Sequence, residues 1–285
     1  MAQKSVQNLV AENKATRRIL AELGALLDAA TQPETSESPR KEGIMAITAT
    51  KTVRELVVEV PNATRVFEKL GIDYCCGGHR TLEGACADAD VAVDDVLRAL
   101  EQNTNGCTAT AARDWNAAPL GDLVDHIVNK HHTYVKAEVP RLQALITKVV
   151  GVHGKNHPEL EQLQIAFCEL AGELGGHLMK EEQILFPYVK QMAGGAGCGP
   201  SCFGTVQNPI QVMMMEHDNA GEKLHEMRQA TSNYILPPDA CSSYGALFAA
   251  LIEFEQDLHE HIHVENNILF PRAVRMESVR LERNG

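Results

Sequence analysis

Several features that would assign this chain to other classes of protein are scarce or missing. Aromatic residues make up only 5% of its 285 residues, and the alternating apolar pattern of a strand is hardly visible. The sequence has no run of about 18 apolar residues that could span a bilayer, and its N-terminus lacks the apolar stretch of a secretion signal. It therefore predicts an all-α, cytoplasmic protein without a membrane segment.

Clustered positive charge is also missing. The chain has 26 Lys and Arg against 38 Asp and Glu, which gives a formal net charge of −12 at pH 7. Nucleic acids are bound by clustered Lys and Arg, so we expect no nucleic-acid partner. The eight cysteines are too few and too irregularly spaced for the disulfide framework of a secreted scaffold, which indicates free thiols.

Residues 1–45 form the first of three predicted parts. An amphipathic helix is expected over residues 5–30, and the polar segment TQPETSESPRKEG at 31–43 is typical of a flexible linker. Three interpretations stay open here: a dispensable extension, a start codon assigned too early before Met45, or a helix for docking or self-association. The last would be consistent with a homodimer.

Residues 46–112 form the second predicted part, a small helical domain. The candidate helix-starting caps are Thr52, with Glu55 completing a capping box, Thr81 and Asp94. Within this part lies the vicinal pair Cys75-Cys76. Neighbouring cysteines rarely bond to each other, because the ring would strain the peptide. The pair either acts on a ligand or consists of small buried residues at a turn, and both interpretations remain open at this point.

The third predicted part, residues 113–278, contains long amphipathic segments separated by Gly- and Pro-containing breaks. Helices are expected over residues 119–150, 158–192, 209–231 and 239–276. Four long helices with short connections are typical of an antiparallel four-helix bundle. The fold class is therefore all-α, with this bundle following the small helical domain.

One stretch of the bundle occurs twice. HLMKEEQILFP at residues 177–187 is repeated as HIHVENNILFP at 261–271, 84 residues later. In each copy a His and a Glu lie four residues apart, so both point from one face of a helix. Two such turns indicate a paired metal site.

The apolar rows of the helices support this interpretation. Glu181 and Glu265 stand where core residues are expected, and no Lys or Arg lies on either row. Because a buried carboxylate without a partner is very costly, a cation between the helices is expected. The third helix supplies His217, whereas periodicity cannot decide between His131 and His132 on the first. The bundle then reads as a duplicated helix pair, in which one helix gives a His and the next gives His-x-x-x-Glu.

The ligand types indicate the metal. Imidazole and carboxylate without thiolate suit iron or manganese better than structural zinc. Six such ligands cannot saturate two six-coordinate ions, so we expect oxo or hydroxo bridges and open positions at which O2 or NO can bind.

Several motifs in order resemble one known family. They are DYCCGG at residues 73–78, Asp114-Trp115, HLMKEEQILFP, MEHDNAG at 215–221 and HIHVENNILFP. Together they resemble the repair-of-iron-centres (YtfE/ScdA) family of hemerythrin-like di-iron proteins, over about residues 50–275. The resemblance implies six metal ligands: His132, His177, Glu181, His217, His261 and Glu265. It also implies that the two Glu bridge two irons.

The same resemblance implies a function and partners. The family repairs iron-sulfur clusters damaged by nitrosative or oxidative stress, through iron donation or handling, so damaged iron-sulfur proteins are the expected partners. Cys75 and Cys76 would act near the metals as redox thiols or as an iron relay. One alternative is a di-iron NO reductase that produces N2O. Another is a hemerythrin-like O2 or NO sensor or carrier, although such a protein does not need a vicinal cysteine domain.

Overall fold

The computed structural model describes residues 47–60, 63–75, 77–105, 114–194 and 203–284. Residues from Ile47 onward form one compact unit, separate from residues 1–46. The expected helix over 5–30, the linker and Cys76 lie outside the described residues. Within the described ranges every regular element is a helix, apart from one isolated bridge between Thr52 and Thr81, so the all-α prediction is confirmed.

The small domain consists of α2 (Val53–Glu59), α3 (Ala63–Leu70), α4 (Leu82–Asp88) and α5 (Val93–Asn105). The predicted capping box is present, because the Thr52 hydroxyl accepts from the Glu55 amide and Glu55 accepts from the Thr52 amide. Thr81 caps α4 in the same way. The predicted cap at Asp94 is wrong: α5 begins one residue earlier, and Asp94 lies in its first turn, where a negative charge favours the helix dipole.

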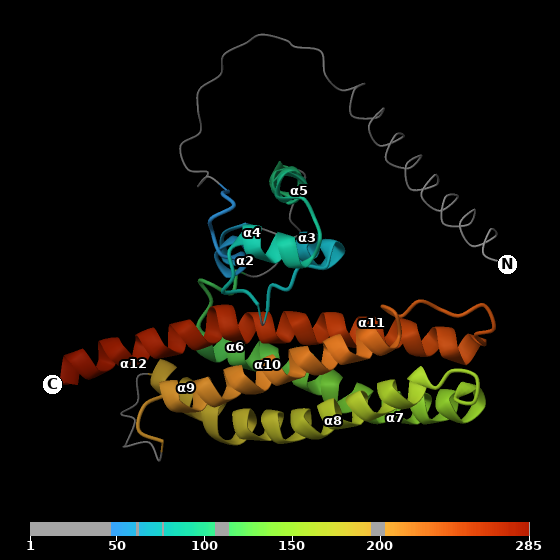
Figure 1. Ribbon diagram of the computed structural model, residues 1–285. Coiled ribbons are helices and arrows are strands. Elements are labelled where there is room, and N and C mark those ends of the chain that lie inside the picture. Colours follow the sequence, from blue (N-terminus) through green and yellow to red (C-terminus); the bar gives the residue numbers. More distant parts are fainter. Residues whose placement is uncertain (1–46, 61–62, 76, 106–113, 195–202, 285) are drawn as a thin grey trace, which may run out of the picture. The chain divides into compact units, whose positions relative to one another are not determined.

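The bundle contains four helical rods. The first is α6 (Leu120–Ile127), η1 (Val128–His132) and α7 (Thr133–His153); the second is α8 (Glu159–Lys180), η2 (Glu181–Leu185) and α9 (Phe186–Ala193); the third is α10 (Gln207–Ala230); the fourth is α11 (Ser242–His263), η3 (Val264–Leu269) and α12 (Phe270–Asn284). Helix α8 packs between α7 and α10, and α11 packs along α7. Figure 1 shows these long helices running side by side, as the antiparallel bundle prediction requires.

The fourth rod extends past its predicted end near residue 276, to Asn284. Contacts of Glu277 explain this extension. The carboxylate of Glu277 is buried and accepts hydrogen bonds from the Tyr188 hydroxyl at 2.8 Å and from the Val206 amide at 2.9 Å. Val206 precedes α10, whose first amides have no partner within the helix. The carboxylate stabilises that helix end, and this contact favours continuation of α12.

Two apolar clusters fill the bundle on either side of a polar layer. One includes Leu174, Leu178, Leu258 and Ile262; the other includes Leu185, Phe186, Leu269 and Phe270, from the repeated Ile-Leu-Phe-Pro. In the second and fourth rods the His-x-x-x-Glu turns lie between the two clusters. Apolar packing above and below thus holds the polar layer. None of the helices in the described part of the chain is long and apolar enough to cross a membrane.

Candidate metal centre

Three of the four rods change from α-helical to π-helical geometry at the repeated polar layer. His132 is the last residue of η1, Glu181 is the first of η2, and Glu265 is the second of η3. A π turn holds one more residue than an α turn, so it alters the direction of side chains without breaking the helix, and such turns are frequent at functional sites. The sequence periodicity gave no sign of these turns.

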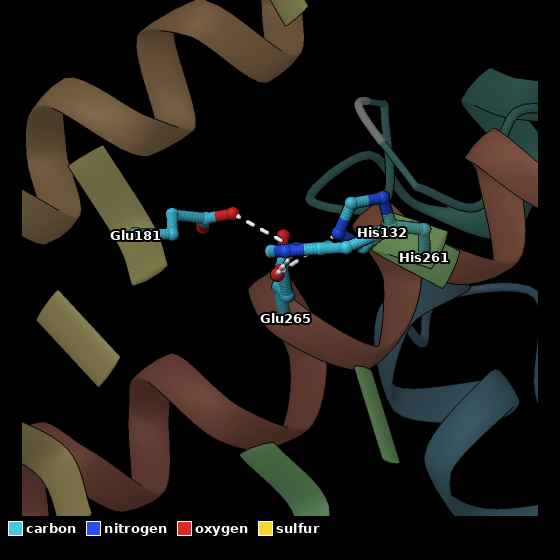
Figure 2. A group of neighbouring side chains, drawn as sticks. All are labelled: His132, Glu181, His261 and Glu265. Atoms are coloured by element: carbon cyan, nitrogen blue, oxygen red, sulfur yellow. Dashed lines mark hydrogen bonds and ion pairs between the residues drawn. The ribbon is translucent and has the colours of Figure 1, made fainter. Parts of the chain in front are cut away.

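The structure brings all six predicted ligand residues together. Two groups of side chains offer donor atoms that all lie within 4.8 Å of one another: His132, Glu181, His261 and Glu265 in one, and His177, Glu181, His217 and Glu265 in the other. Every member is buried. Figure 2 shows the first group with its imidazoles and carboxylates pointing toward one another. That these residues bind metal remains a prediction.

Both carboxylates belong to both groups. Glu265 Oε1 lies 3.1 Å from His261 Nε2, while its other oxygen, Oε2, lies 3.1 Å from His217 Nε2. Glu181 Oε2 lies 3.4 Å from His132 Nε2 and 3.3 Å from His177 Nε2. The arrangement therefore has the connectivity of a site for two cations with shared carboxylates.

The grouping crosses the sequence repeat. Each group takes one imidazole from the first helix pair and one from the second: His132 with His261, and His177 with His217. The duplicated unit inferred from the sequence suggested instead that a helix pair assembles its own His and His-x-x-x-Glu. The buried carboxylates lie at the centre of the bundle, where all four rods meet, so neither half is complete by itself.

Three of the imidazoles are held from behind by polar side chains that the sequence analysis missed. In each case the outer nitrogen, Nδ1, donates the hydrogen bond. His132 donates to Glu182 at 2.7 Å, His177 donates to Glu216 at 2.9 Å, and His217 donates to Asn266 at 2.9 Å. Such bonds orient the rings so that Nε2 points into the layer, where a metal could bind it; here Nε2 of His177 and Nε2 of His217 lie 3.1 Å apart and share a hydrogen bond. Each partner directly follows or precedes a predicted ligand in the sequence, and this adjacency is the signal that could have revealed it.

A cation fits the buried polar atoms of the layer. Among the described residues, Nε2 of His132, both oxygens of Glu181 and Oε2 of Glu265 are buried and make no hydrogen bond. Burying a charged carboxylate oxygen without a hydrogen-bond partner or a counter-charge destabilises the folded state. Positive ions bound between them would satisfy these atoms, and the imidazole and carboxylate donors suit iron.

The ionisation of these groups shows how strongly they attract positive charge. Burial alone would raise the pKa of Glu265, but electrostatic attraction to the nearby imidazoles, His261 first and then His217, outweighs it and holds this pKa well below its usual range. Burial likewise opposes protonation of His177, yet Glu181 and Glu265 raise its pKa to about 9. The two carboxylates thus draw positive charge into an apolar bundle, here as a proton on His177.

A small cavity of about 10 Å³ adjoins the imidazoles. Its lining combines His177, His217 and His261 with apolar side chains and two carboxylates; the other members are Leu170, Glu173, Leu174, Glu216, Ala220, Leu258 and Ile262. This volume holds about one water-sized molecule. The site therefore has room for a very small ligand beside the imidazoles.

Cys75 is buried in the turn after α3. Asp73 organises this turn: its carboxylate accepts from the Cys75 amide at 3.0 Å, the Cys75 thiol at 3.3 Å and the Gly77 amide at 2.8 Å. The Asn266 amide donates to the Cys75 carbonyl at 3.5 Å. The side chain of Asn266 thus joins His217, a predicted ligand, to the cysteine turn.

Two domain families match the chain. The hemerythrin HHE cation binding domain matches residues 123–273, more than half of the chain, and ScdA_N, a domain of unknown function, matches residues 49–104. The iron-sulfur cluster repair protein YtfE of Salmonella schwarzengrund (strain CVM19633) is 40% identical over 220 residues, which cover 77% of this chain and 94% of that protein.

The chain belongs to the YtfE family.

Further members agree. YtfE of Escherichia coli O81 (strain ED1a) is 39% identical over 224 residues, and YtfE of Citrobacter koseri is 39% identical over 220 residues; in both cases 77% of this chain and 94% of the relative are covered. The family resemblance inferred from the motifs is therefore confirmed. The YtfE match and the hemerythrin match also agree with a metal-binding role for the His and Glu layer.

Proposed function

We propose that this protein repairs iron-sulfur clusters damaged by nitrosative or oxidative stress, by donating iron from a two-iron centre. The observation that carries the proposal is the sharing of Glu181 and Glu265 between two groups of buried donors. The name of the YtfE relatives, iron-sulfur cluster repair protein, supports the function and makes damaged iron-sulfur proteins the partners.

The imidazoles, the carboxylates and the surrounding apolar side chains would each contribute differently to the proposed centre. His132, His177, His217 and His261 present Nε2 toward the shared carboxylates, and the apolar clusters above and below exclude water. Two bound irons would supply exchangeable iron and open ligand positions for NO or O2. An additional oxo or hydroxo bridge stays a prediction.

Cys75 and Cys76 are proposed to act as redox thiols or as an iron relay. The hydrogen bond from Asn266 to the Cys75 carbonyl supports this role, because Asn266 also accepts from His217. Replacing both residues, as Cys75→Ser/Cys76→Ser, should slow the restoration of a nitrosylated iron-sulfur enzyme while iron content is kept. Restoration at the wild-type rate would remove the cysteines from the mechanism.

Metal analysis with Mössbauer spectroscopy, before and after NO, tests the centre. We expect two irons per chain and a spectrum of coupled irons that changes with NO. Glu265→Gln should lose iron because it removes a shared charge, whereas Glu253→Gln, an exposed carboxylate on α11, should not. A metal-free protein, or one with a single zinc, contradicts the proposal.

A second candidate function is NO reduction, which the small cavity beside His177, His217 and His261 favours. The balanced reaction consumes two NO, two electrons and two protons and gives N2O and water. Gas analysis with excess reductant distinguishes this activity. Many N2O per centre indicate an enzyme, whereas at most one per centre leaves repair as the function.

A further inference from the structure

A third group of metal-ligating side chains lies beside the six-residue layer. His131, Asp257 and Glu260 each offer one donor atom, and these atoms lie within 4.8 Å of one another. His131 comes from η1, next to His132, and the two acids come from α11 at a spacing of three residues, which places them on one helix face. We refer to these three residues as the outer cluster.

The outer cluster leads from the surface to the interior. The side chain of Glu260 is 48% exposed, that of Asp257 is 15% exposed and that of His131 is fully buried. Nδ1 of His131 lies 3.0 Å from Oδ1 of Asp257. A cation arriving from solvent would therefore meet Glu260 first and His131 last.

Part of the donor capacity of the outer cluster is unused. Within the described residues, the buried atoms His131 Nε2 and Asp257 Oδ2 make no hydrogen bond. Such buried polar atoms are costly unless a partner supplies charge or a hydrogen bond. This is independent of the proximity of the three side chains, and it points to an ion as the missing partner of Asp257.

The inner end of the outer cluster touches the metal centre. The ring of His131 stacks on that of His261, with centroids 5.3 Å apart and an angle of 4° between planes. His132, His177 and His217 each have a hydrogen-bond acceptor at Nδ1, but His261 Nδ1 has none in the described part of the chain. His261 is consequently the least constrained of the four imidazoles, and its ring face is the one that His131 contacts.

A lysine neutralises the outer end. Lys130 Nζ lies 2.7 Å from Glu260 Oε1, and both side chains are substantially exposed, at 41% and 48%. Exposed ion pairs contribute little stability, so this ammonium can be displaced at small cost. An arriving divalent cation would take its place between Glu260 and Asp257.

We propose that His131, Asp257 and Glu260 form an exchangeable divalent-cation site through which iron enters or leaves the buried centre. One imidazole and two carboxylates suit ferrous or manganous ions, and three protein ligands leave positions open for water and for ligand exchange. The transfer breaks and forms only metal-ligand bonds and involves no oxidation. This inference rests on the proposed function, because it requires a centre that exchanges iron.

The test uses the full, iron-loaded chain and Mn²⁺ as the probe, followed by the electron paramagnetic resonance signal of free Mn²⁺. Two variants, Asp257→Asn and Glu260→Gln, each remove one negative charge from the outer cluster without changing any of the six central residues. Glu253→Gln is the matched control, because it removes one exposed charge from the same helix. Iron content is measured for every protein.

We expect the wild-type and control chains to bind one Mn²⁺, and the two variants to bind it at least about tenfold more weakly, since even indirect support of a metal is worth that much. Transfer of iron to a ferrous chelator should slow in the same two variants, with iron content at the start unchanged. Equal Mn²⁺ binding or equal transfer rates in wild type and variants would overturn the outer site. A wild-type chain that holds no iron would instead overturn the two-iron centre itself. It would also overturn the proposed role of the outer cluster, which depends on that centre.

Discussion

Asn266 is a residue whose two ends contact different parts of the molecule. Its oxygen accepts from His217, and its nitrogen donates to the Cys75 carbonyl. We predict that Asn266→Ala lowers iron affinity by about 10- to 100-fold, because it removes the support behind a ligand. Iron content after dialysis against a graded chelator series measures the change.

The neighbouring residue provides the control for that prediction. Asn267 contacts the Tyr74 carbonyl and His263 but none of the six central side chains. Asn267→Ala should therefore keep wild-type iron affinity. Equal losses in both variants would show that contact with the small domain, and not support of His217, determines iron binding.

Cys241 is an exposed thiol whose reactivity is expected to change with pH near neutrality. His153 Nε2 lies 3.1 Å from its sulfur, and this hydrogen bond, together with backbone amides at the start of α11, lowers the pKa of Cys241 to about 7. Because the thiolate is the reactive form, alkylation of Cys241 should rise between about pH 6 and pH 8 and then level off. Mass spectrometry of the labelled peptide follows the reaction. In His153→Ala the rise should move to higher pH, and an unchanged profile would refute the role of this imidazole.

The type of a residue and its place on a helix decide which residues of the candidate site could be predicted from the sequence. Glu181 and Glu265 were identifiable because a carboxylate on an apolar row is costly and therefore informative. Glu216 and Asn266 were not, since a polar residue next to a ligand usually faces solvent and only the neighbouring helix shows otherwise. The choice between His131 and His132 depended on the π turn, which places His132 toward both carboxylates and His131 toward Asp257.

At the scale of elements, the π turns are the least predictable part of the fold. Helix periodicity located the ends of the four rods to within about three residues, except the end of the fourth, which continues to Asn284 instead of stopping near residue 276. One extra residue in a turn, however, hardly disturbs an apolar row. Deleting the exposed Gln183 from η2 should let the segment close as an α-helix and move Glu181 away from His132. Circular dichroism should show retained helix content while iron content falls. The substitution Gln183→Ala keeps the extra residue and should keep the iron; loss of iron in it as well would contradict this explanation.

Packing between the rods depends on the apolar cluster around Phe254. This ring is fully buried and lies edge-on to Phe167 at 5.8 Å. Phe254→Ala should lower the free energy of unfolding by about 3–5 kcal/mol, through lost burial and the cavity left behind. Denaturant unfolding of the chain measures the change. Ile165→Ala, at a position 60% exposed, should cost less than about 1 kcal/mol, and a similar loss at both positions would contradict the assigned core.

At the scale of the whole molecule, the three-part division into 1–45, 46–112 and 113–278 stays a prediction. Its first boundary agrees with the separation of residues 1–46 from the unit that begins at Ile47. Deleting residues 1–44 should leave iron content and the unfolding midpoint unchanged, because both apolar clusters and all six central residues lie beyond them. A fall in either would show that this segment supports the unit.

The same deletion addresses the predicted homodimer. Mass measured by light scattering before and after removal of residues 1–44 separates the alternatives for this segment. A change from dimer to monomer would assign self-association to it, whereas an unchanged number of subunits would exclude that role. Sequence could not decide this question, since an amphipathic helix next to a polar linker fits docking and dispensability equally well.

The pairing of His132 with His261, and of His177 with His217, also bears on how the chain matures. Neither helix pair holds a complete set of the predicted donors, so a two-iron centre would form only after residues 120–193 have met residues 207–284. Iron bound at the proposed centre would link the beginning and the end of the bundle, and a chain that lost this iron would also lose that link. Iron occupancy would thus report whether the fold has been completed, and each donation of iron would be followed by a looser, unloaded state that must be refilled.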